Sequence, residues 1–271
     1  MELKFEKNFN YQILGEPVIS SENTIVYKAR EMELVRDVCI KGVKLKGKND
    51  FERSKNLKLA LREVKTIVKV RNEHIINIAD VYNVFHDKRN QILYIIMQWI
   101  DGKTLRETDS CEKEFLQWMI KLCEILECME RKEIYHRDIK PENIIINKFR
   151  NLYLIDFNLS LRAPNKKEGT INYRAPEMNQ VFKYPSREKV DIFSIGVILY
   201  EFYTKELPID KKHYYKKGSK STKWEFFIEP KISNPKISNK LNETIIKCMK
   251  LNPKDRFDSI NELKRCLNSL I

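Results

Sequence analysis

The chain has 271 residues, of which 42% are hydrophobic and 10% aromatic, and this composition excludes a wholly disordered chain. Its seven glycines and nine prolines exclude collagen-like and Gly/Pro-rich low-complexity sequences. Lys and Arg outnumber Asp and Glu by 51 to 38. The formal charge of +13 favours an acidic partner, such as a nucleotide, a nucleic acid, an acidic peptide or an anionic membrane, without choosing among them.

The cysteines and the first residues bear on the cellular compartment. The six cysteines form no C-x-x-C pair and have no histidine at metal-binding spacing, which predicts reduced thiols. The opening residues, MELKFEKNFNYQ, are charged and mixed, unlike a signal peptide. The longest apolar stretches, Ile92–Ile100 and Val190–Tyr203, are shorter than the about 20 residues of a membrane span. We therefore expect a soluble, cytoplasmic protein.

Up to about residue 100, short runs typical of β-strands predominate, and one long helical pattern interrupts them. In this pattern, from about Phe51 to Val70, apolar residues recur at i, i+3 and i+4 spacing, which favours one buried face. The expected strands are Tyr11–Leu14, Ile25–Ala29, Val35–Leu45, Ile78–Phe85 and Ile92–Trp99.

After residue 100, helical patterns predominate. The segment Phe115–Leu126 carries one apolar stripe, and Asp191–Tyr203 is apolar nearly all round, which predicts a buried helix. Further helices are expected at Leu241–Met249 and Ser259–Leu270. The chain is therefore expected to be α+β, with a small β-rich lobe that contains one long helix, followed by a larger, mainly helical lobe.

A hairpin is expected within the second half. Ile144–Ile146 and Tyr153–Ile155 have the pattern of short strands, joined by a turn at Lys148–Asn151. This hairpin would bring Asp156 back beside Asn143.

The most informative segment is His136-Arg137-Asp138-Ile139-Lys140-Pro141-Glu142-Asn143. Asp138 is suited to accept or orient a hydroxyl proton, and Lys140 to neutralise charge on a transferred phosphoryl group. Asn143 offers a carbonyl oxygen to a hard cation, and Asp156 would supply the second oxygen ligand for magnesium. The alternative is a charged surface loop, which does not explain this combination of residue types at this spacing.

This segment resembles the catalytic loop of eukaryotic-type (Hanks-type) serine/threonine protein kinases, and the resemblance continues elsewhere. Val38-Cys39-Ile40-Lys41 resembles the family's V-A-I-K strand, and Glu63 lies on the long helix where the family places the partner of this lysine. Ala175-Pro176-Glu177 is similar to the A-P-E segment, and Arg256 matches the arginine expected to pair with Glu177.

A further match is Asp191-Ile192-Phe193-Ser194-Ile195-Gly196, which resembles the family's D-x-W-S-x-G helix start with Phe193 in place of Trp. The resemblance extends over about residues 11 to 270. It implies a single kinase domain over residues 1–271, with an N-lobe of about 1–97, a hinge of about 98–102 and a C-lobe of about 103–271.

The resemblance also implies ATP and Mg²⁺ as cofactors, with Mn²⁺ as an alternative metal, and Ser or Thr of a protein substrate as the acceptor. Thr170 is expected to contact Asp138 and Lys140. The implied catalytic residues are Asp138, Lys140, Lys41 and Glu63, and the implied metal ligands are Asn143 and Asp156. The implied nucleotide-binding residues are Val18, Val26, Cys39, Lys41, Met97, Gln98, Ile100 and Ile145.

Two segments depart from the family pattern. Ile19, Ser21 and Thr24 stand where the phosphate-covering loop has glycines, so a weaker hold on the phosphates is expected, and Glu22 would add negative charge there. Asp156-Phe157-Asn158 replaces D-F-G. This change is expected to be mild, because Asn tolerates left-handed backbone better than most residues.

These departures leave alternatives open. A pseudokinase scaffold with little or no turnover would fit the glycine-free loop, but the polar residues that carry the chemistry are all retained. A small-molecule kinase is disfavoured by Lys140, the A-P-E segment and Arg256, which suit a protein acceptor.

Two further segments bear on regulation and partners. The stretch Asn165-Lys166-Lys167-Glu168 has no hydroxyl, so activity is expected without phosphorylation of the activation segment, Asp156–Glu177. Lys211–Lys223 carries six lysines and no acidic residue. A solvated loop is one interpretation and a docking patch for an acidic partner is the other. The sequence contains no clear nucleic-acid-binding motif.

Overall fold

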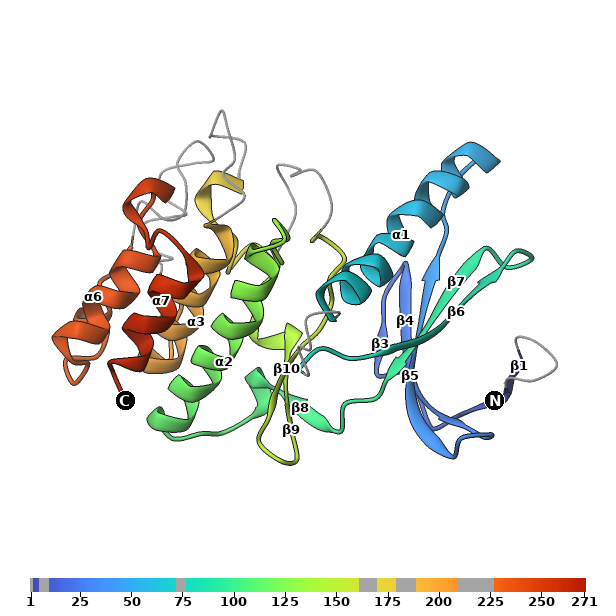
Figure 1. The fold of residues 1–271 in the computed structure, drawn as a ribbon, viewed down its shortest axis with the longest axis horizontal. Helices are drawn as coiled ribbons and strands as arrows, with labels where there is room; N and C mark the ends of the chain where they lie inside the picture. The colour runs from blue at the N-terminus through green and yellow to red at the C-terminus, as the bar shows by residue number, and fades with distance from the viewer. Residues whose placement is uncertain (1, 5–9, 72–76, 161–169, 179–188, 209–226) are drawn as a thin grey trace. The chain divides into compact units, whose positions relative to one another are not determined.

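The computed structural model describes residues 2–4, 10–71, 77–160, 170–178, 189–208 and 227–271. The chain divides into two compact units (Figure 1). The first comprises Met1–Gly102 and Ile155–Asn158, and the second comprises Lys103–Leu154 and Leu159–Ile271.

The first unit is an antiparallel β-sheet with one long helix, which confirms the predicted β-rich lobe with a long helix. The strand order is β1-β2-β4-β5-β7-β6, and β3 pairs with β4. The helix α1 spans Asp50–Arg71. The strands are β1 (Glu2–Lys4), β2 (Asn10–Ile13), β3 (Ile19–Ser20), β4 (Thr24–Glu31), β5 (Arg36–Lys44), β6 (Val81–Asp87) and β7 (Ile92–Gln98).

The alternation of side chains along β5 places two apolar clusters on opposite faces of the sheet and directs Lys41 toward α1. On β5, Val38 and Ile40 lie in a cluster with Tyr11 of β2. Val43 contacts the other cluster, which contains Ala60 of α1. Because side chains of a strand alternate between faces, Lys41 shares the face of Val43, toward α1.

Most predicted strands begin or end one or two residues from their observed boundaries, and the starts of β5 and β6 show the reasons for the differences. Val35 has φ 50° and is 64% exposed, so it belongs to the turn between β4 and β5, and β5 begins only at Arg36. Strand β6 begins at Val81 and not at Ile78. The carbonyl of Ile78 instead accepts a hydrogen bond of 2.8 Å from Nη1 of Arg71, the last residue of α1. Ile78 is fully buried, so its apolar character reflects packing and not strand pairing.

The second unit is mainly helical, with a small sheet in the order β10-β9-β8. The predicted hairpin is confirmed, and Ile144 lies opposite Leu154. The strands are β8 (Gly102–Thr104), β9 (Ile144–Asn147) and β10 (Leu152–Leu154). The helices are α2 (Glu112–Glu130), α3 (Val190–Thr204), α5 (Pro230–Ser233), α6 (Asn239–Cys248) and α7 (Ile260–Asn268), and the 3-10 helices are η1 (Leu105–Glu107), η2 (Pro141–Asn143), η3 (Pro176–Met178) and η5 (Pro253–Asp255).

Helix α3 is the buried helix that its sequence predicts. Every residue from Val190 to Tyr200 is buried. A glycine at position 196 permits close packing against α6, since a Cβ there would lie 2.5 Å from Cβ of Cys248. The shorter helices α6 and α7 begin at the side-chain caps Ser238 and Ser259, whose hydroxyls accept backbone N–H groups.

Candidate functional site

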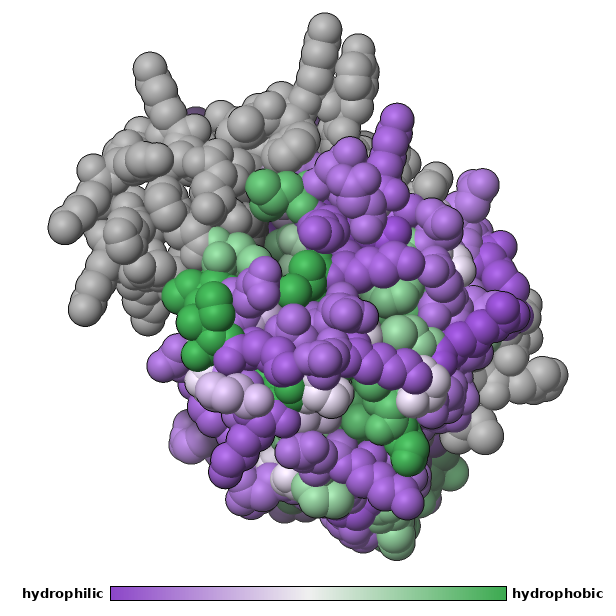
Figure 2. Space-filling view, turned by 90° about the vertical axis from the view of Figure 1, so that its left-hand side faces the viewer, coloured by the Kyte–Doolittle hydropathy of each residue, from purple (hydrophilic) through white to green (hydrophobic). Residues whose placement is uncertain are grey.

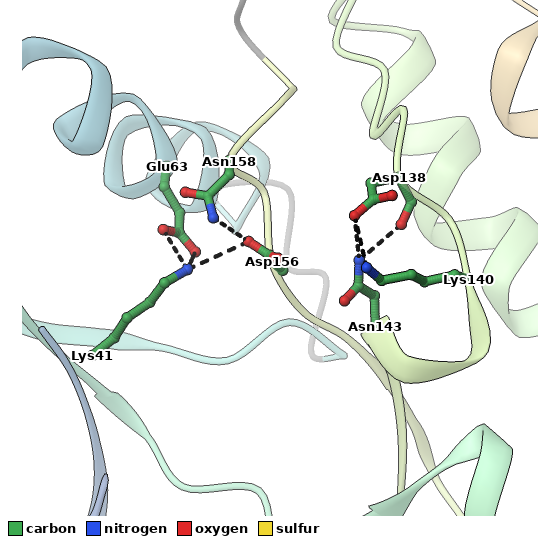
Figure 3. Close-up of polar contacts among 7 residues, drawn as sticks. All are labelled: Lys41, Glu63, Asp138, Lys140, Asn143, Asp156 and Asn158. Atoms are coloured by element: carbon green, nitrogen blue, oxygen red, sulfur yellow. Dashed lines mark hydrogen bonds and ion pairs between the residues drawn. The ribbon is translucent and has the colours of Figure 1, made fainter. Parts of the chain in front are cut away.

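Lys41 of β5 forms a buried ion pair with Glu63 of α1 (Figure 3). The Lys41 Nζ lies 2.8 Å from each carboxylate oxygen of Glu63 and 3.4 Å from Oδ1 of Asp156. Lys41 and Glu63 are 7% and 2% exposed. The predicted pairing of Lys41 with Glu63 is therefore confirmed.

The electrostatics keep Lys41 charged in this buried position. Burial alone would lower the pKa of Lys41, but the charges of Glu63 and Asp156 outweigh it and raise the pKa above its ordinary value. A fixed cation of this kind suits the binding of phosphate oxygens.

Asp156 lies in the irregular segment after β10 that belongs to the first unit. Its φ of 66° is in the left-handed region, and two residues later Nδ2 of Asn158 donates a hydrogen bond of 2.5 Å to Oδ1 of Asp156 (Figure 3). The sequence prediction of a mild change at Asn158 concerned only its backbone. The side-chain contact was not foreseen, since a sequence does not fix a rotamer.

The segment that replaces the family's glycine-rich loop forms an ordered turn between β3 and β4. The Ser21 N–H donates to the carbonyl of Thr24 at 2.9 Å, and the Thr24 N–H donates to Oγ of Ser21 at 3.1 Å. The Glu22 carboxylate pairs with Nζ of Lys46 at 2.5 Å, and this bond lowers the pKa of Glu22. The negative charge of Glu22 therefore has a partner within its own unit.

The other candidate nucleotide-binding residues lie on several strands. Val26 is buried on β4, and Cys39 lies on β5, where burial raises the pKa of its thiol to about 12. Met97 and Gln98 end β7, and the Gln98 N–H donates to the carbonyl of Asp80 at 2.7 Å. In the same unit Ile100 is buried and Val18 is 58% exposed, while Ile145 lies on β9 of the second unit.

The catalytic-loop residues of the second unit form one hydrogen-bonded group (Figure 3). Lys140 Nζ lies 3.2 Å from Oδ2 of Asp138 and donates to Oγ1 of Thr170 at 2.9 Å. Thr170 donates to Oδ1 of Asp138 from its N–H and its hydroxyl, both at 2.8 Å. The predicted contacts of Thr170 are therefore confirmed. Asn143 Nδ2 donates to the carbonyl of Asp138 at 2.8 Å, and thus its own carbonyl oxygen is turned away from Asp138.

Asp138 is held in its ionised form. Burial would raise the pKa of Asp138, but the charge of Lys140 and the hydrogen bonds from Thr170 outweigh it and hold the pKa below the ordinary value. A carboxylate in this form can accept or orient a hydroxyl proton.

The first turn of α3 anchors the backbone of the catalytic loop through Asp191. The N–H groups of His136 and Arg137 donate to the two carboxylate oxygens of Asp191, both at 2.7 Å. Arg137 has φ 65°, so the backbone turns sharply just before Asp138. The predicted partner of Glu177 is also confirmed, because Arg256 donates to both of its carboxylate oxygens at 2.7 Å.

One group beside the loop was not predicted from the sequence. Arg106 of η1 donates to Oε1 of Glu142 at 3.0 Å, to Oε1 of Glu201 at 2.5 Å and to the hydroxyl of Tyr173. Tyr173 in turn donates to Oε2 of Glu201 at 2.5 Å. These residues belong to no short motif that would indicate their contact, since they come from four separate segments of the chain.

Other predictions concern residues outside the described part or features spread along the chain. The hydroxyl-free stretch 165–168 and the lysine-rich segment 211–223 lie outside the described residues. The six cysteines, all of them among the described residues, form no disulfide with one another. Within the described residues, no group of three or more His, Cys, Asp or Glu side chains could hold a metal ion, and no helix is long and apolar enough to cross a membrane.

Comparison with known proteins identifies the family. Residues 17–267 match the family model of the protein kinase domain. The chain is 30% identical over 265 residues to a probable serine/threonine-protein kinase of Clostridium perfringens, which covers 93% of this chain and 36% of that protein.

Two other relatives are similar over most of this chain. Aurora kinase A-B of Xenopus laevis is 29% identical over 90% of this chain and 58% of its own length, and the serine/threonine-protein kinase PrkC of Bacillus subtilis is 25% identical over 88% and 37%. The chain thus spans between about a third and somewhat more than half of the length of these relatives. The family model matches most of the chain, and the Lys41–Glu63 pair and the catalytic-loop geometry agree with it. The chain therefore belongs to the protein kinase domain family, in its eukaryotic-type serine/threonine class.

Proposed function

We propose that the chain is an ATP- and Mg²⁺-dependent protein kinase that transfers the γ-phosphoryl group to Ser or Thr of a protein substrate. The observation that carries this proposal is the contact group of Asp138, Lys140 and Thr170, which holds an ionised carboxylate next to a cation. Two relatives are named as serine/threonine-protein kinases, and this supports Ser or Thr as the acceptor.

The oxygens of Asp156 and Asn143 are ligands suited to a hard divalent cation. No described residue donates a hydrogen bond to Oδ2 of Asp156 or to the side-chain oxygen of Asn143, so each offers one oxygen of the type that Mg²⁺ prefers. When bound, Mg²⁺ neutralises negative charge on the phosphates. Lys41, anchored by Glu63, would hold phosphate oxygens. Of the three hydrogen bonds of Lys41, the one to Asp156 is the longest, at 3.4 Å, and is therefore the easiest to replace by a bond to a phosphate oxygen.

The remaining roles follow from the catalytic-loop contacts. Asp138 would orient the attacking hydroxyl, and Lys140 would stabilise charge that develops on the transferred group. Thr170 would hold both in place. The nucleotide-binding roles of Val18, Val26, Cys39, Met97, Gln98, Ile100 and Ile145 stay part of the proposal.

We further propose that activity needs no phosphorylation of the activation segment. Thr170 already contacts Asp138 and Lys140 in the unmodified chain, which supports this view. Phosphosite mapping of active protein would test it. A modified residue between Asp156 and Glu177 whose substitution abolishes turnover would contradict it.

The direct test is phosphate transfer from γ-labelled ATP to a basic protein substrate, followed by analysis of the labelled amino acid. We expect label on Ser or Thr, and a loss of about a hundredfold or more in D138A and D156A, because each removes a charged group that acts in the transition state. Absence of transfer by folded wild-type protein with Mg²⁺ or Mn²⁺ would instead favour the pseudokinase scaffold.

A further inference from the structure

The two oxygens of the Asp156 carboxylate differ in their surroundings. Oδ1 accepts a hydrogen bond from Nδ2 of Asn158 at 2.5 Å and lies 3.4 Å from Nζ of Lys41. No described residue donates to Oδ2, and the Asp156 side chain is 34% exposed. One oxygen is therefore held by the protein and the other is left for a ligand.

The contact defines which way Asn158 points. A carboxylate only accepts hydrogen bonds, so the group that faces it must be the NH₂ of the carboxamide and not its oxygen. Glycine, which the family pattern has at this position, has no side-chain donor. The hydrogen bond is therefore a property of this chain and not of the family pattern.

We propose that Asn158 is a positioning residue for the divalent cation, because its carboxamide fixes the plane of the Asp156 carboxylate and keeps Oδ2 available for coordination. The proposal rests on the proposed metal-dependent kinase function and adds a residue to it. A carboxylate rotates over a broad range about its last torsion. Two donors on one oxygen restrict that rotation before the cation arrives.

The physical reason for a gain in affinity is preorganisation. Binding costs less when the ligand group already has its bound orientation. Mg²⁺ demands near-ideal octahedral geometry, so a freely rotating carboxylate would weaken the binding of Mg²⁺ in particular. Without Asn158, Lys41 at 3.4 Å would be the one described donor left on Oδ1.

The test is direct cation binding and does not depend on turnover. Mn²⁺ is titrated into protein with ADP and followed by electron paramagnetic resonance of free Mn²⁺, and Mg²⁺ affinity is measured by competition. We expect N158G and N158L to weaken both cations about three- to tenfold, the size of one lost hydrogen bond. Leu is close to Asn in size but cannot donate, and Gly restores the family's residue and its backbone freedom.

A matched control lies in the same unit. Nδ2 of Asn90 donates to Oδ2 of Asp87 at 2.8 Å in the exposed turn after β6, so N90G removes a similar Asn–Asp bond away from the site. N90G should leave Mn²⁺ binding unchanged. Circular dichroism and thermal unfolding of each variant verify that it folds.

The outcomes separate the two proposals. If wild-type protein binds Mn²⁺ with ADP, D156N loses this binding, and N158G and N158L bind as wild type does, the role of Asn158 is wrong while the kinase proposal stands. Tighter binding by N158G would likewise overturn it, since backbone freedom would then matter more than the hydrogen bond. If wild-type protein binds no cation, both proposals fail.

Discussion

The Arg256 side chain is fully buried, and each of its nitrogens has an oxygen partner. Besides the two bonds to Glu177, it donates to the backbone carbonyls of Lys189 and Lys250, both at 2.9 Å. Its guanidinium also lies 4.9 Å from the ring centre of Phe193 on α3. Such a cation is tolerated in a core only while its carboxylate partner remains.

The first prediction concerns this pair. E177A should lower the free energy of unfolding by about 3–5 kcal/mol, because it leaves a buried guanidinium without its counter-charge. Urea denaturation followed by circular dichroism measures the change. The double variant E177M/R256M should lose less than E177A alone, since no buried charge is then left unpaired. A loss below about 1 kcal/mol in E177A would show that the pair behaves like an exposed one.

At the residue scale, the sequence predicts contacts that short motifs encode. The Lys41–Glu63 and Glu177–Arg256 pairs were expected, because the family pattern links each member to its partner, and the structure confirms both. The bond from Asn158 to Asp156 was not expected. The residue type alone does not determine whether the carboxamide turns toward the carboxylate or toward solvent.

At the scale of elements, Arg106 connects three parts of the second unit. It links η1 to Glu142 of η2, to Glu201 of α3 and to Tyr173, three residues after Thr170. Burial, and then the bond to Glu201, raises the pKa of Tyr173, so its hydroxyl stays protonated and donates. The group therefore fixes the backbone that carries Thr170.

The second prediction follows from this link. R106M should raise KM for the protein acceptor about tenfold and leave KM for ATP nearly unchanged, because the segment around Thr170 loses its anchor while the Lys41 group is intact. Steady-state kinetics with each substrate varied in turn measures both constants. R53M is the matched control, since among the described residues Arg53 on α1 contacts the carbonyl of Gly47 and the carboxylate of Asp50, neither of which belongs to the candidate site. Equal rises in both KM values for R106M would contradict a role confined to the acceptor side.

Element positions were largely predictable, and their edges were not. The periodicity of α1 and α3 predicts helices that the structure confirms within about a residue at each end. The start of β6 was wrong by three residues, because Ile78 is apolar for packing and its carbonyl is bonded to Arg71. A pattern of apolar residues indicates which side chains are buried, but it does not indicate which backbone groups form the hydrogen bonds between strands.

At the scale of the whole molecule, the dominant feature is the excess of positive charge. The formal charge is +13, and the described residues on the face in Figure 2 are mostly hydrophilic, with scattered apolar side chains. Several exposed ion pairs, such as Lys121–Glu124 at 2.8 Å and Lys46–Glu22 at 2.5 Å, offset this excess of positive charge locally. Exposed pairs of this type contribute about 0–1 kcal/mol each, so the net repulsion should outweigh them.

The third prediction tests that balance. Raising NaCl from about 0.01 M to about 0.1 M shortens the Debye length from about 30 Å to about 10 Å, and we expect Tm to rise as the repulsion is screened. Differential scanning fluorimetry measures Tm, and choline chloride at equal ionic strength separates screening from specific ion binding. A fall in Tm in both salts would mean that attractive pairs dominate.

The grouping of Ile155–Asn158 with the first unit, although the residues on both sides belong to the second, has a consequence for dissection of the chain. The polypeptide passes between the units three times, so no single cut yields either unit whole. A fragment that ends at Gly102 would contain Lys41 and Glu63 but would lack Asp156 and Asn158. Proteolytic mapping or fragment expression would thus separate the Lys41–Glu63 pair from Asp156, and the two units cannot be isolated from each other by one cut.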